Sequence, residues 1–257
     1  MLNRCIPLFA AVVVLLPVGP VLAQTEHNPS GAPEGWPAPI HDAQINSLVL
    51  FDQLEYRDGD GPGALGWDLL SWIGGDSNRL WVETEGQALT EDGEGEIERL
   101  DVLYGHLIAP FWDVQAGLSY QRAWGSGPDA DRVSAVIGLQ GLAPYAFEVD
   151  TNLRISQDGD VSADIQATYD LLFTQRLVLQ SRIESVYAFQ TVEEFGVGRG
   201  LNSLGLGFRL RYEIRRELAP YLGLTWSRRY GETADLARAE GNDPVGTAVV
   251  AGLRLWF

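Results

Sequence analysis

The stretch GLNSLGLGFRLRYEIRR, residues 200–216, decides the fold. Apolar residues occupy every second position, and small or charged residues stand between them. The apolar set is Leu204, Leu206, Phe208, Leu210, Tyr212 and Ile214, and the other set is Ser203, Gly205, Gly207, Arg209, Arg211, Glu213 and Arg215. Side chains alternate between the two faces of a β-strand, so one face is hydrocarbon and the other is small or ionic. A soluble sandwich would bury the first face, whereas a transmembrane barrel would turn it to lipid and turn the second to a lumen.

The last residues favour the barrel. Leu253, Leu255 and Phe257 share one face of a final strand-like run that ends on the phenylalanine. Alternating apolar positions followed by a terminal phenylalanine are typical of bacterial outer-membrane barrels. We therefore predict an all-β fold, a transmembrane antiparallel up-and-down β-barrel.

Strand-like runs of roughly ten residues recur along the chain, the length that a barrel strand needs. They lie near 45–56, 65–73, 78–87, 96–108, 111–122, 132–141, 144–156, 160–171, 175–189, 201–215, 219–230 and 246–257, about 12 strands in all. Short links, such as 74–77 and 217–220, alternate with longer acidic links, such as 89–96 and 230–246. Outer-membrane barrels show this alternation of short periplasmic turns and long outer loops.

The first segment has the features of a secretory signal. Arg4 precedes an apolar run at 6–16, and Val21-Leu22-Ala23 supplies a small residue for cleavage. The run is too short for a membrane helix, which takes roughly 20 residues. We predict a signal peptide at 1–23, a short flexible periplasmic tail rich in Pro, Gly and polar residues at 24–44, and the barrel at 45–257.

Composition limits the chemistry. The formal net charge is −17, which argues against nucleic acid as a partner and favours cations. Cys5 and Met1 are the sole Cys and Met, and both lie in the signal segment. Thiolate and thioether ligands are therefore absent from the predicted mature chain.

The alternation places more carboxylates than guanidinium groups on the inner face. Same-face pairs such as Glu83 with Glu85 and Glu148 with Asp150 provide oxygen ligands, which suit hard cations and Cu(II). Alternatively, the inner carboxylates and arginines pair across strands and plug the bore. His41, beside the first strand, either joins a metal site at the periplasmic mouth or is merely solvated.

Asp52 and His106 are polar residues at positions of the apolar face. Asp52 falls on the apolar face of Leu50 and Leu54, which implies a bulge or a different register there. His106 falls on the lipid face near a periplasmic strand end. Since no His–Ser–acid arrangement, GxSxG or HExxH is present, we predict that the protein is not an enzyme and has no catalytic residues.

Several blocks resemble the outer-membrane copper resistance protein B family. They are IGGDSNRLWVETEG (73–86), LYGHLIAPFWDVQAGLSY (103–120), GLAPYAFEVD (141–150), YDLLFTQRLVLQSR (169–182), the stretch 205–243 and the terminal AGLRLWF. The resemblance implies a barrel in the cell outer membrane of a Gram-negative bacterium that takes part in copper tolerance. It also implies a periplasmic multicopper oxidase or copper carrier as a partner.

The family's acidic positions on the first and third strands match Glu55, Glu83 and Glu85, and the resemblance implies that these carboxylates bind the copper ion. Two departures stand out: the tail lacks the Met- and His-rich stretch of many members, and Phe173 replaces a leucine. Oxygen ligands without thioethers favour Cu(II) over Cu(I).

The leading hypothesis is a barrel that binds or conducts copper ions through an acidic lumen. The alternatives are a general cation-leaning pore without copper selectivity and a plugged barrel that anchors a periplasmic partner through residues 24–44.

Overall fold

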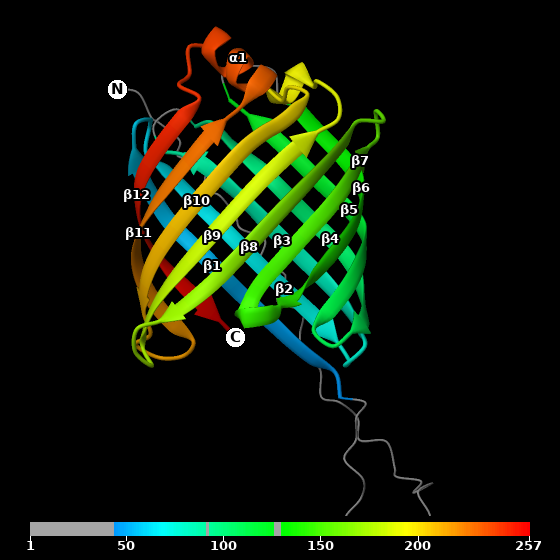
Figure 1. The fold of residues 1–257 in the computed structure, drawn as a ribbon, viewed down its shortest axis with the longest axis vertical. Helices are drawn as coiled ribbons and strands as arrows, with labels where there is room; N and C mark the ends of the chain where they lie inside the picture. Colours follow the sequence, from blue (N-terminus) through cyan, green and yellow to red (C-terminus); the bar gives the residue numbers. More distant parts are fainter. Residues whose placement is uncertain (1–43, 91–92, 126–129) are drawn as a thin grey trace, which may run out of the picture. The chain divides into compact units, whose positions relative to one another are not determined.

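The computed structural model describes residues 44–90, 93–125 and 130–257. The predicted signal peptide, most of the predicted tail and His41 lie outside this part of the chain. The described residues form a closed antiparallel barrel in which each strand pairs with its sequence neighbours and β1 pairs with β12 (Figure 1). The strands are β1 Asn46–Gly59, β2 Ala64–Gly74, β3 Asn78–Leu89, β4 Gly95–Ala109, β5 Trp112–Trp124, β6 Ala130–Ala143, β7 Phe147–Ser156, β8 Val161–Leu172, β9 Leu177–Ala188, β10 Gly200–Tyr212, β11 Leu218–Arg229 and β12 Val245–Trp256.

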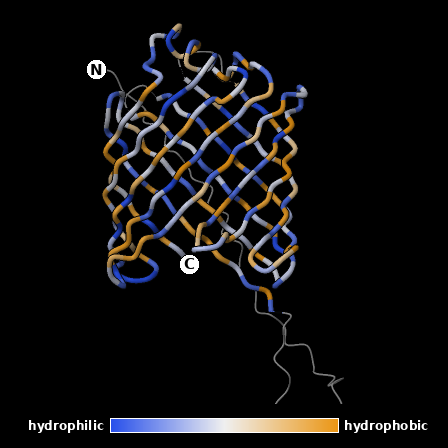
Figure 2. The backbone as a smooth tube through the Cα atoms, viewed as in Figure 1, coloured by the Kyte–Doolittle hydropathy of each residue, from blue (hydrophilic) through white to orange (hydrophobic). Residues whose placement is uncertain are grey.

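The prediction of an all-β barrel is confirmed, and so is the assignment of its two faces. Phe208 and Tyr212 are 48% and 49% exposed on the outer surface, whereas Arg209 and Arg211 are 4% and 5% exposed inside. Figure 2 shows hydrophobic and hydrophilic residues alternating along the strands. The outward apolar side chains form the lipid-facing belt of a membrane barrel.

The anomaly at Asp52 is a bulge. The pairing of β1 with β2 shifts between Phe51 and Gln53, so Leu50 lies opposite Leu70 while Leu54 lies opposite Trp67. The extra residue changes which face the strand presents. Asp52 thereby reaches the lumen, where its Oδ1 accepts a hydrogen bond of 2.8 Å from Arg254 Nε.

One predicted turn is wrong. Residues 217–220 were expected to link two strands, yet Leu218 already begins β11 and Pro220 pairs with Leu253 of β12. The β10–β11 ladder begins only at Tyr221, so the missing N–H of Pro220 costs no bond on that side. The linking segment is instead 213–217.

The long link after β11 contains a helix that the alternation did not indicate, α1 (Gly231–Ala239). Figure 1 shows it at the barrel end opposite the short turns. Its Thr233, Ala234 and Ala237 are buried, and it contacts β10. Two short 3₁₀ segments, η1 (Pro144–Ala146) and η2 (Glu193–Phe195), lie in other links. Within the described residues, none of the helical segments is long and apolar enough to cross a membrane.

The helix is tied to the β9–β10 link. Glu232 Oε2 accepts hydrogen bonds from Thr191 Oγ1 at 2.6 Å and from the Arg199 backbone N–H at 3.0 Å. Thr233 Oγ1 accepts another from the Gly198 N–H at 2.9 Å. These bonds, here called the outer clasp, hold two outer links together over the rim.

Candidate functional site in the lumen

The best-neutralised carboxylate of the lumen is Glu55 on β1. Its Oε1 accepts from Arg57 Nε and Arg209 Nη2, and its Oε2 accepts from Arg209 Nε and the Tyr221 hydroxyl, at 2.8 to 2.9 Å. The side chain is fully buried. A carboxylate has about four lone-pair positions, and here all four are used. Of the residues predicted to hold a metal, Glu55 is thus the least available.

A second group of charges faces the lumen from β2, β3, β4, β7, β8 and β9, and we call it the carboxylate ring. Its arginines are Arg99, Arg154 and Arg182, and the carboxylates that they contact within 4 Å are Asp68, Glu83, Glu85, Asp101, Asp150, Asp164 and Glu184. Three guanidinium groups therefore share seven carboxylates. With every group ionised, the ring carries four uncompensated negative charges, which a bound cation would offset.

The shortage of positive charge is greatest at Glu83. Register places it directly opposite Asp101 of β4, so two carboxylates share one cross-strand position. Its ion pair is with Arg99, at 3.8 Å, and its Oε1 has no hydrogen-bond partner although the side chain is 3% exposed. Glu85, two residues on, contacts Arg182 at 2.7 Å and Arg99 at 3.3 Å. Glu83 is therefore the ring member whose charge the protein leaves most open.

The predicted pair Glu148 and Asp150 is divided by the structure. Asp150 joins the carboxylate ring through Arg99 at 3.4 Å and accepts a hydrogen bond from Asn152. Glu148 is exposed near the periplasmic end of β7 and forms no ion pair with any residue that the structure describes. Asp150 thus belongs to the ring, whereas Glu148 lies at the mouth.

The barrel contains an apolar cluster that the sequence patterns did not predict. Trp81, Leu103 and Val136 are buried there, with Leu70 and Trp72 packed against them. Trp81 precedes Glu83 by two residues on the inward face of β3, toward the short β2–β3 turn. The sequence feature that could have predicted this cluster is that the inward positions of β2 and β3 near their common turn hold tryptophan and leucine. The cluster narrows this side of the bore beside the ring.

His106 is the histidine that the described residues contain, and it does not face the lumen. His41 stays a prediction, and His106 is exposed on the outer face of β4, as expected. In residues 44–257, apart from the gaps at 91–92 and 126–129, no group of three or more His, Cys, Asp or Glu side chains is arranged to hold a metal.

A closed barrel of twelve strands, with an apolar belt outside and an ionic bore inside, is an outer-membrane β-barrel protein. The NanC porin is similar in fold, with a TM-score of 0.50 at 12% identity over 82% of this chain and 99% of that one.

The sequence comparisons define the family. The model of the copper resistance protein B precursor (CopB) matches residues 45–257. Copper resistance protein B of Escherichia coli is 42% identical over 218 residues, which cover 85% of this chain and 72% of the relative. A homolog from Pseudomonas syringae pv. tomato is 40% identical with the same coverage. The chain belongs to the copper resistance protein B family, and its role lies in copper resistance.

Proposed function

We propose that this barrel binds copper ions in its acidic lumen or conducts them through it, without catalysing a reaction. The observation that carries the proposal is the carboxylate ring, in which seven carboxylates share three arginines. Family membership supplies the identity of the ion, and the charge excess supplies a reason for a cation to enter.

Arg99 is the member of the ring that gives way to a cation. Its contacts with Glu83, Glu85 and Asp150 are 3.3 to 3.8 Å long, beyond the range of a strong charge-assisted hydrogen bond. Arg182, in contrast, holds Asp68 at 2.6 Å. A cation beside Glu83 replaces the distant guanidinium and frees Glu85 and Asp150 as further oxygen ligands.

The ligands favour Cu(II). Among the described residues the inner wall supplies carboxylate oxygens and no imidazole, thiolate or thioether, and Cu(I) prefers soft sulfur ligands. His41 of the tail remains the predicted nitrogen ligand at the periplasmic mouth. We also propose that a periplasmic multicopper oxidase or copper carrier exchanges the ion with the barrel.

Equilibrium dialysis of the purified barrel against Cu(II) tests this proposal. Glu83→Gln should lower the affinity for Cu(II) at least about tenfold, because a carboxylate contact to a metal exceeds the 1.4 kcal/mol that a factor of ten represents. Glu240→Gln removes the same charge from an outer link and serves as the matched control. Unchanged retention after combined Glu83→Gln, Glu85→Gln, Glu148→Gln and Asp150→Asn substitution would refute a lumen site.

A cation-leaning pore without copper selectivity is the second candidate. It is favoured by the hard oxygen donors of the wall, which select charge more than they select a particular metal. Reversal potentials in a planar bilayer distinguish the two: equal permeability to K⁺ and Cu²⁺ supports the plain pore. Negligible conductance, together with loss of copper tolerance when 24–44 is deleted, would support the plugged barrel.

A further inference from the structure

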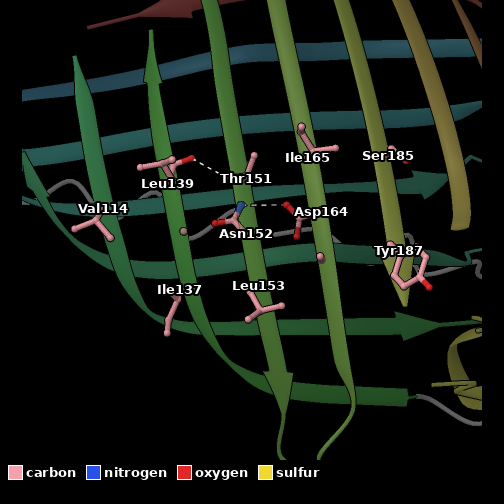
Figure 3. Close-up of a pocket in the computed structure, with 12 residues that line it drawn as sticks. Val114, Ile137, Leu139, Thr151, Asn152, Leu153, Asp164, Ile165, Ser185 and Tyr187 are labelled. Atoms are coloured by element: carbon pink, nitrogen blue, oxygen red, sulfur yellow. Dashed lines mark hydrogen bonds between the residues drawn. The ribbon is translucent and has the colours of Figure 1, made fainter. Parts of the chain in front are cut away.

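A groove crosses the lipid-facing wall over β5 to β9 (Figure 3). Its volume is about 470 Å³. Two adjacent rows of outward side chains, each aligned by the strand register, line it. The first row is Val114, Leu139, Thr151, Ile165 and Ser185, and the second is Ile137, Leu153, Ala163 and Tyr187.

The groove exists because small side chains meet at its floor. Thr151, Ala163 and Ser185 come from three adjacent strands, and larger residues such as Leu153 and Tyr187 stand beside them. An apolar cavity of roughly 150 Å³ can take up benzene. A groove of 470 Å³ therefore has room for a longer hydrocarbon.

The polar groups at the floor are satisfied within the protein. Thr151 Oγ1 donates to the Leu139 carbonyl at 3.3 Å, and Ser185 Oγ donates to the Ser203 carbonyl at 2.9 Å. Asn152 and Asp164 contribute backbone to the wall, while their side chains bond each other on the lumen face at 3.1 Å. The floor of the groove thus offers hydrocarbon contact, because the hydroxyl groups of Thr151 and Ser185 are already bonded to backbone carbonyls.

At its periplasmic end the first row leads to polar residues. Val114 lies opposite His106 of β4, and His106 lies opposite Asn78 of β3, close to the short turns. Asn78 Oδ1 accepts from the Tyr104 hydroxyl at 2.7 Å and contacts His106 Nδ1 at 2.8 Å. Because an amide oxygen only accepts, Nδ1 carries a proton, and in this tautomer Nε2 is the acceptor of the ring.

We propose that the groove holds an acyl chain of a phospholipid from the periplasmic leaflet, and that its ethanolamine ammonium group donates to His106 Nε2. A linear chain fills a groove that runs across strands. A second copy related by two-fold symmetry would place the same concavity against itself and leave a void. The Nε2 acceptor matches an ammonium group with N–H donors and not a quaternary amine.

Native mass spectrometry of the purified barrel with equimolar phosphatidylethanolamine and phosphatidylcholine tests the assignment. The barrel should retain the ethanolamine lipid about fivefold better, as expected for one hydrogen bond. His106→Phe should abolish this preference while retaining both lipids. Ala163→Leu should weaken retention of both lipids about tenfold, since it displaces about two methylene groups.

Ala251→Leu is the matched control, because Ala251 faces outward on β12 opposite Tyr56 and Leu222, away from the groove. Ser185→Leu fills the same groove from β9 and replaces Ala163→Leu should that variant not fold. Equal retention of the two lipids by the unaltered barrel overturns the head-group assignment. Equal losses of lipid retention in Ala163→Leu and Ala251→Leu would overturn the acyl-chain site. So would a result in which Ala163→Leu disrupts a dimer of the barrel and not lipid retention.

Discussion

Glu55 and Glu83 show how much the surroundings decide what one residue type does. Both are glutamates on inward faces, and both side chains are nearly inaccessible to solvent. Glu55 accepts four hydrogen bonds, two of them from Arg209, whereas Glu83 has one arginine at 3.8 Å. The first glutamate therefore holds Arg209 in place, and the second is the one that we propose as an ion ligand.

At this scale we predict opposite effects of the same substitution on stability. Glu55→Gln leaves Arg209 buried with one carboxylate fewer and should destabilise the barrel by about 3–5 kcal/mol, as breaking a buried ion pair does. Glu83→Gln removes repulsion with Asp101 and should be neutral or stabilising. Urea unfolding of the lipid-reconstituted barrel, followed by tryptophan fluorescence, measures both. Similar destabilisation by the two substitutions would contradict the contrast drawn between them.

At the scale of elements, α1 and the β9–β10 link are joined at the outer rim by hydrogen bonds to a titratable group, Glu232. The hydrogen bonds that Glu232 accepts from Thr191 and the Arg199 backbone lower the pKa of its carboxyl group. A group whose folded-state pKa is depressed contributes stability above its unfolded pKa, and this contribution is lost as the pH falls through the folded value. The two clasp bonds that Glu232 accepts are thus favoured at neutral pH and are weakened in acid, whereas the bond to Thr233 does not titrate.

We predict that amide hydrogen exchange in α1 accelerates as the pH falls below the ordinary glutamate pKa of about 4.3, after correction for intrinsic exchange. Thr191→Ala removes the leading cause of the lowered pKa and should move this transition to higher pH. Glu240→Gln, on the same link but outside the clasp, should leave it in place. A corrected amide-exchange rate in α1 that does not depend on pH would show that the bonds to Glu232 do not hold the helix.

The whole molecule depends on the separation of a hydrocarbon exterior from an ionic interior. Leu222 is 67% exposed on the outer face of β11, whereas Gln166 faces the lumen opposite Asp150 and Glu184. An arginine introduced at position 222 would therefore meet acyl chains, whereas one introduced at position 166 would meet carboxylates.

For the whole barrel we predict that Leu222→Arg costs about 2–4 kcal/mol in a bilayer, the range found for an arginine on the lipid face near the midplane. Gln166→Arg should cost little and should reduce cation selectivity, because it adds a charge beside the carboxylate ring. Unfolding from liposomes and reversal potentials measure the two effects. If Gln166→Arg destabilises the barrel as much as Leu222→Arg, Gln166 does not face a carboxylate-rich lumen.

The sequence by itself determined the strands, their two faces and the closed barrel, because alternation is a property of consecutive residues. It also placed Glu83, Glu85 and Asp150 inside and suggested the irregularity at Asp52. It did not find α1 or the end of β10, since neither follows from alternation.

Only the tertiary structure decided which inner carboxylates are neutralised, because their partners are distant in sequence. Arg209 reaches Glu55 across 154 positions, and Arg182 reaches Asp68 across 114. The groove likewise requires the register of five strands at once. Alternation assigns a side chain to a face, but strand register and the course of the barrel decide which side chains meet there.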